Sequence, residues 1–112
     1  MTRIEALKRI AEKVEAGEWS NRKTLAMDAG FDLDAIVYAV RAYSGSLDAA
    51  KALHEAVLPG WDYIVARTNG GLITLAQVGP DVEEFDQDPA RAWLLAILRA
   101  LIAQEEEEKL DD

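Results

Sequence analysis

Hydrophobic positions repeat with a helical period in the first 58 residues and again in residues 88–104, and with a strand period in between. The first apolar stripe follows a T-x-x-E sequence that begins at Thr2. The stripe stops before Gly17. A threonine followed three residues later by a glutamate forms a capping box, and glycine commonly ends a helix. The pattern therefore predicts a first helix between these two residues.

Two more helices are predicted before position 60. Asp32 or Asp34 can cap the first of them, and Ser46 can cap the second, which ends at a Pro-Gly pair at positions 59–60. The segment between the first two predicted helices, residues 19–30 (WSNRKTLAMDAG), fits one or two helical turns or an ordered loop. Both alternatives stay open from the sequence.

From Trp61 the period changes from 3.6 to 2, which indicates strands. The stretch WDYIVART alternates between two sides, and Asn69-Gly70 supplies the positive-φ residues that a tight hairpin turn requires. GLITLAQV is the returning strand, and residues 82–85 fit a short third strand. Because both faces of this hairpin are largely apolar, helices are expected on both sides of the sheet.

The last helix is predicted from Asp88 to Gln104, with Asp88 as its cap and proline at its first position. Apolar side chains cover well over half of its circumference, so most of its surface must be buried. The prediction is one α+β domain over residues 1–104, with a small antiparallel sheet packed between helix layers around this helix. The length of 112 residues leaves room for one domain.

The formal net charge is −9, and residues 105–112 (EEEEKLDD) contribute six acids and one lysine to it. Such a run repels itself and has little to bury, so it is predicted to be an acidic tail, either a frayed helix end or a disordered solubilising segment. Direct nucleic-acid binding is disfavoured, since phosphate contacts need a basic face. No apolar run is long enough for a membrane span, so no membrane association is expected.

Cysteine is absent and His54 is the only histidine. This excludes disulfides and thiolate chemistry, agrees with a reducing compartment such as the bacterial cytoplasm, and leaves no metal or cofactor site to predict. His54 itself is predicted to be partly exposed or to cap its helix. Neither a nucleophile elbow nor a phosphate-binding loop occurs, and the acids of residues 81–88 lack the spacing of a calcium loop. We therefore predict no enzyme.

Four side chains are candidate contacts for a partner or ligand: Trp19, Tyr43, Arg67 and Arg91. Tryptophan and tyrosine bury large areas at small entropic cost, and arginine recognises anions. Arg91 falls within the apolar arc of the last helix, where a guanidinium cannot be buried alone. It is therefore expected to reach a nearby acid or to point into an accessible cleft. The acids considered for this pair are Asp81, Glu84 and Asp86.

Two sequence blocks, YSGSLDAAKALHEAVLPGW at 43–61 and DPARAWLLAILRALIA at 88–103, and the hairpin between them resemble the phage α-β-α sandwich domain family. The resemblance implies a sheet between helix layers and a phage or prophage origin, and it carries no catalytic residues. It favours a non-enzymatic accessory protein that binds a host protein in the host cytoplasm, for example an inhibitor of a bacterial defence system such as an anti-CRISPR. The alternative is a protein that binds or sequesters a small nucleotide signal. The sequence leaves open whether the protein forms a homodimer.

Overall fold

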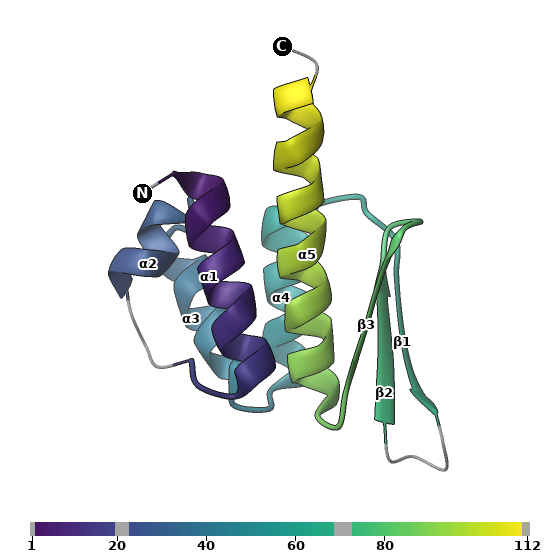
Figure 1. The fold of residues 1–112 in the computed structure, drawn as a ribbon. Helices are drawn as coiled ribbons and strands as arrows, with labels where there is room; N and C mark the ends of the chain where they lie inside the picture. Colours follow the sequence, from purple (N-terminus) through teal and green to yellow (C-terminus); the bar gives the residue numbers. More distant parts are fainter. Residues whose placement is uncertain (1, 20–22, 69–72, 111–112) are drawn as a thin grey trace.

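The computed structural model describes residues 2–19, 23–68 and 73–110, and its fold is α+β as the sequence predicts. Within these residues the helices and strands are α1 (Arg3–Ala16), α2 (Lys23–Asp28), α3 (Leu33–Tyr43), α4 (Leu47–Val57), β1 (Tyr63–Thr68), β2 (Ile73–Val78), β3 (Val82–Asp86) and α5 (Pro89–Leu110). Figure 1 shows the helices gathered on one side and the sheet on the other, with α5 between them. The segment that the sequence left open contains the short helix α2.

Three helices begin at the predicted caps. The side-chain oxygens of Thr2, Asp32 and Ser46 each accept the backbone N–H three residues later, at 3.3, 2.8 and 3.1 Å. These bonds satisfy donors that the first helical turn leaves unpaired. At the other end of α1, Gly17 has a φ of 70°, a left-handed conformation that favours glycine. Local sequence signals therefore determine where these helices begin and where α1 ends.

The three strands form an antiparallel sheet in the order β1-β2-β3. Tyr63 lies opposite Val78, and Val78 in turn lies opposite Val82. The predicted third strand is thus present at the edge of the sheet. The hairpin turn predicted at Asn69-Gly70 falls in residues 69–72, outside the described part of the chain.

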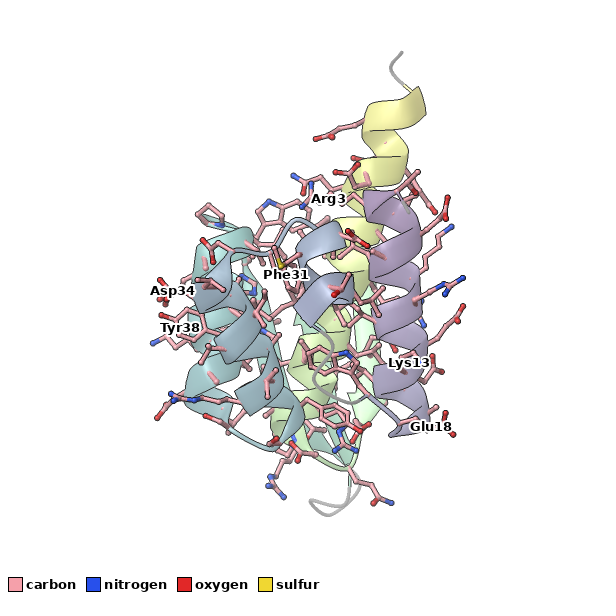
Figure 2. The ribbon with its side chains drawn as sticks, turned by 90° about the vertical axis from the view of Figure 1, so that its left-hand side faces the viewer. Arg3, Lys13, Glu18, Phe31, Asp34 and Tyr38 are labelled. Atoms are coloured by element: carbon pink, nitrogen blue, oxygen red, sulfur yellow. The ribbon has the colours of Figure 1, made fainter. Side chains whose placement is uncertain are left out.

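Helix α5 is the element on which the others pack, as its apolar composition predicts. It contacts α1, α3 and α4 on one side and all three strands on the other. Nine of its side chains are at most 2% exposed: Ala90, Ala92, Leu94, Leu95, Ala96, Ile97, Leu98, Ala100 and Leu101. Viewed from the helical side, Lys13, Glu18 and Asp34 point outward (Figure 2), so the polar faces of these helices lie on the surface.

The helices cover only one face of the sheet, whereas the sequence predicts helices on both. Alternate side chains of β2 (Thr74, Ala76 and Val78) are buried toward α5. On the opposite face Ile64 and Phe85 are 56% and 58% exposed. Figure 1 shows no helix on that side of the described sheet. An alternating pattern indicates which residues share a face, but it does not indicate what covers that face.

The acidic segment, predicted to be a frayed helix end or a disordered tail, is helical through Leu110, because α5 continues into it. Glutamate is a good helix former, and α1 supplies cations beside this extension. Glu105 pairs with Arg3, and Glu106 lies 3.1 Å from Lys8. The four glutamates therefore extend the central helix past the core instead of forming a separate tail.

Candidate binding surface

Three of the four predicted contact residues lie together at the junction of α1, α3 and α5. The rings of Trp19 and Tyr43 meet edge to face, with centroids 5.6 Å apart. The guanidinium carbon of Arg91 lies 4.3 Å from the centroid of the same tyrosine ring, a cation–π contact. Trp19 is only 5% exposed, so it has little surface to offer a partner. The fourth residue, Arg67, is exposed on β1 and takes no part in these ring contacts.

Of the two predicted alternatives for Arg91, the ion pair with a nearby acid is not found among the described residues. Arg91 Nη2 instead donates to the backbone carbonyl of Tyr43 at 3.1 Å. Tyr43 is the last residue of α3, where carbonyl groups lack helical partners and the helix dipole favours a cation. The Nε of Arg91 is buried without a hydrogen-bond partner. The guanidinium thus caps a helix end and packs on an aromatic ring.

His54 is also placed differently from the prediction, because it is only 2% exposed. The indole N–H of Trp93 donates to its Nδ1 at 3.3 Å, and its Nε2 lies 2.8 Å from the carbonyl oxygen of Trp61. Indole is a donor only, so Nδ1 accepts and Nε2 donates to that carbonyl. The ring of Tyr63 packs on the imidazole at 4.7 Å. His54 is therefore a satisfied core residue that joins α4, α5 and β1.

A short chain of ion pairs links the sheet to α1 through Arg99 of α5. Arg99 Nη2 lies 2.9 Å from Glu15 of α1, and Nε lies 3.4 Å from Glu84 of β3. Burial raises the pKa of Glu84 above its ordinary value of 4.5, and this effect outweighs the opposing influence of Arg99. The Glu84 carboxylate therefore opposes folding when it is charged.

Replacing Glu84 with glutamine is expected to flatten the pH dependence of stability. A carboxyl with a raised pKa in the fold binds its proton more tightly there, so its stabilising contribution is complete at low pH and is lost as pH rises above about 4.5. Urea unfolding of the wild type and Glu84→Gln at pH 4.5 and pH 7 measures this. The wild type should lose stability relative to the variant over this interval. A constant difference would contradict the expectation, and Glu83→Gln is the matched control.

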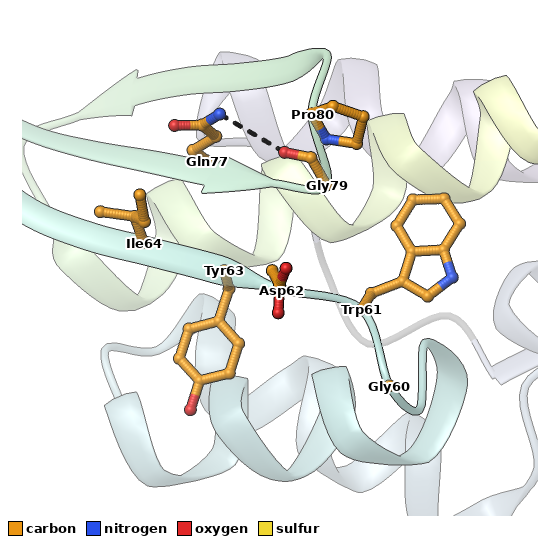
Figure 3. Close-up of a pocket in the computed structure, with 8 residues that line it drawn as sticks. All are labelled: Gly60, Trp61, Asp62, Tyr63, Ile64, Gln77, Gly79 and Pro80. Carbon is orange, nitrogen blue, oxygen red and sulfur yellow. Dashed lines mark hydrogen bonds between the residues drawn. The ribbon is translucent and has the colours of Figure 1, made fainter.

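A pocket of about 610 Å³ opens where the chain enters β1 and leaves β2 (Figure 3). Two glycines in left-handed turns build it: Gly60, with a φ of 83°, precedes β1, and Gly79, with a φ of 67°, follows β2. The ring of Trp61 lies so close to Gly79 that a Cβ there would be 3.0 Å from two ring atoms. The lining residues are Gly60, Trp61, Asp62, Tyr63, Ile64, Gln77, Gly79 and Pro80.

The lining of this pocket combines aromatic surface with hydrogen-bond acceptors. Among the described lining residues Asp62 supplies the only carboxylate, and none is a lysine, an arginine or a histidine. Gln77 donates from its amide nitrogen to the carbonyl of Gly79 at 3.4 Å, which turns the amide across the mouth of the pocket. Such a lining can hold a donor or a cation against an aromatic wall, and its described residues include no cationic side chain to attract an anion.

The pocket opens onto the outer sheet face, by which we mean Ile64, Ala66, Leu75, Gln77, Glu83 and Phe85. The strand register aligns these side chains in two rows across the sheet. In one row Leu75 lies between Ala66 and Phe85, and in the other Gln77 lies between Ile64 and Glu83. Four of these six described side chains are apolar, Glu83 is acidic, and none is a lysine or an arginine.

Comparison with known proteins identifies no relative: no protein-family model, no curated protein and no solved structure matches the chain. The resemblance to phage α-β-α sandwich domains therefore stays a prediction. None of the described helices is long and apolar enough to cross a membrane. In the same part of the chain, no three histidine, cysteine, aspartate or glutamate side chains are grouped as metal ligands.

The residues of the outer sheet face and the pocket were not among the candidates chosen from the sequence. The choice by residue type favoured large aromatic and cationic side chains, whereas the outer sheet face exposes Ile64 and Phe85, with the half-buried Leu75 beside them. One signal was present, because both faces of the predicted hairpin are apolar. A small chain has few elements with which to cover a second face, so such a hairpin also indicates an exposed binding surface.

Proposed function

We propose that the protein is not an enzyme and that it acts by binding another protein through the outer sheet face. The observation that carries the proposal is the exposure of Ile64 and Phe85, at 56% and 58%, on a flat face that no described helix covers. Large apolar side chains gathered on a surface typify interaction sites, and aromatic anchors contribute much of the binding energy.

The charges around this face favour a basic partner over a second copy of the chain. Glu83 lies on the outer sheet face and Asp62 lies beside it, and the whole chain carries a net charge of −9. Two copies facing each other would bring like charges together, which opposes association. A partner with apolar side chains surrounded by lysines and arginines matches both the centre of the face and its border.

In this proposal the partner is a host protein in the bacterial cytoplasm, as the phage resemblance implies. A basic, partly apolar groove is typical of proteins that hold nucleic acid, and an acidic binder placed in such a groove would exclude it. Inhibition of a nucleic-acid-directed defence system, as by an anti-CRISPR, would follow. The nucleotide-binding alternative is weaker, because the lining of the 610 Å³ pocket holds no cation to meet a phosphate.

Site-specific photocrosslinking tests the proposal. A photoreactive phenylalanine analogue at position 85 should give a discrete adduct with one bacterial protein that has a basic surface. The same analogue at Leu33, which is 71% exposed on α3, is the matched control and should give none. Identical adducts from both positions would contradict the proposed face. An adduct consisting of two copies of the chain would show a homodimer instead.

A further inference from the structure

The pocket beside Trp61 is lined by the rings of Trp61 and Pro80 and by Asp62, whereas the ring of Tyr63 points away from it and packs on His54. In Figure 3 Asp62 lies between Trp61 and Tyr63 along the chain, with Pro80 and Gln77 across from it. The ring of Trp61 is held in place by its packing on Gly79, where no larger residue fits without displacing it. Packing therefore fixes the position of the indole, and the exposed Asp62 is accessible to a ligand.

A second, smaller pocket of about 180 Å³ adjoins the first and shares Trp61 and Pro80 with it. Its lining adds the carboxylates of Asp81 and Glu107. Three acids therefore line the two pockets that share Trp61, and none of the described lining residues is a lysine or an arginine. A recess lined by charges of one sign concentrates counter-charges, so this position attracts a cation.

We infer that the pocket beside Trp61 receives a guanidinium group, namely an arginine side chain of the protein partner. A guanidinium stacks on an indole face and donates two parallel hydrogen bonds to a carboxylate, here that of Asp62. Ile64 and Gln77 belong both to the pocket and to the outer sheet face, so a partner seated on that face is adjacent to it. The inference rests on the proposed function and specifies the chemistry of the partner.

A titration with blocked tri-arginine peptide tests this inference without the partner, with the Trp61 indole N–H observed by NMR. The peptide should shift this signal, and Asp62→Asn should weaken binding at least fivefold. Asp34→Asn removes an exposed acid of α3 at a distant position (Figure 2) and should leave binding unchanged. Equal weakening by both variants overturns the inference, because net charge alone would then explain binding. Equal binding of tri-lysine overturns the assignment of a guanidinium.

The same variants separate this inference from the proposed function. If Phe85 cross-links a basic partner while Trp61 does not respond to tri-arginine, the pocket inference fails and the proposed function stands. If Trp61 responds and Asp62→Asn abolishes the response, but position 85 yields no adduct, the proposed function fails and the cation site stands. An adduct at position 85 that Asp62→Asn also weakens supports both.

Discussion

Replacing Trp93 with alanine is expected to lower the free energy of unfolding by about 3–5 kcal/mol. Trp93 is buried on α5 and forms a three-ring cluster with Tyr63, at 4.6 Å, and His54, at 5.9 Å. Its removal opens a void at the contact between the sheet and the helices. It also leaves the Nδ1 of buried His54 without its donor, which adds a desolvation cost.

Trp93→Phe separates the two contributions, because it keeps most of the ring and removes only the N–H donor. We expect this variant to lose about 1–3 kcal/mol, the cost of an unsatisfied buried acceptor together with a small void. Urea unfolding followed by circular dichroism measures both variants. Met27→Ala, at a side chain exposed on α2, is the control and should change stability by less than about 0.5 kcal/mol. If Trp93→Phe were as stable as the wild type, the bond to His54 would contribute nothing.

Arg91→Ala is expected to cost about 2 kcal/mol, and Arg91→Met less than about 1 kcal/mol. Alanine removes both the side-chain packing on Tyr43 and the bond to the carbonyl at the end of α3. Methionine keeps most of the packing volume, and it removes a buried Nε that has no partner. Since no described acid pairs with Arg91, neither variant leaves a carboxylate behind.

Thermal unfolding of the two variants provides the measurement. Arg41→Ala, at an exposed arginine of α3, is the control. The wild type and Arg91→Met should have similar melting temperatures, and Arg91→Ala should have a lower one. Equal losses in both variants would show that the positive charge, and not the packing, stabilises this junction. Unchanged stability in both would show that the contact with Tyr43 contributes nothing.

The local features of the fold follow from short stretches of sequence. The caps at Thr2, Asp32 and Ser46 were predictable because each bond joins residues three positions apart. The strands were predictable from their alternation, and the central position of α5 from its apolar circumference. The caps depend on interactions within one helix. The strands and α5 were predictable because their apolar side chains must be buried, whichever elements pack on them.

The features that sequence reasoning missed depend on pairs that are distant along the chain. Arg91 contacts Tyr43, 48 positions away, and His54 contacts Trp93, 39 positions away. The sequence around one residue of such a pair does not indicate which distant residue it will contact. The nearby acids suggested an ion pair for Arg91, yet the chain turns its guanidinium toward a helix end. For the same reason the exposed face of the hairpin was not predictable, because its exposure depends on where all the helices pack.

The central position of α5 has a consequence for the synthesis of the protein. Every other described element precedes α5 in the chain, and most of them pack against it. While the ribosome is still making residues before 89, the apolar sides of α1, α4 and the sheet have no central helix to cover them. The native core therefore assembles only after the last helix has emerged, and until then the nascent chain exposes surfaces that chaperones bind.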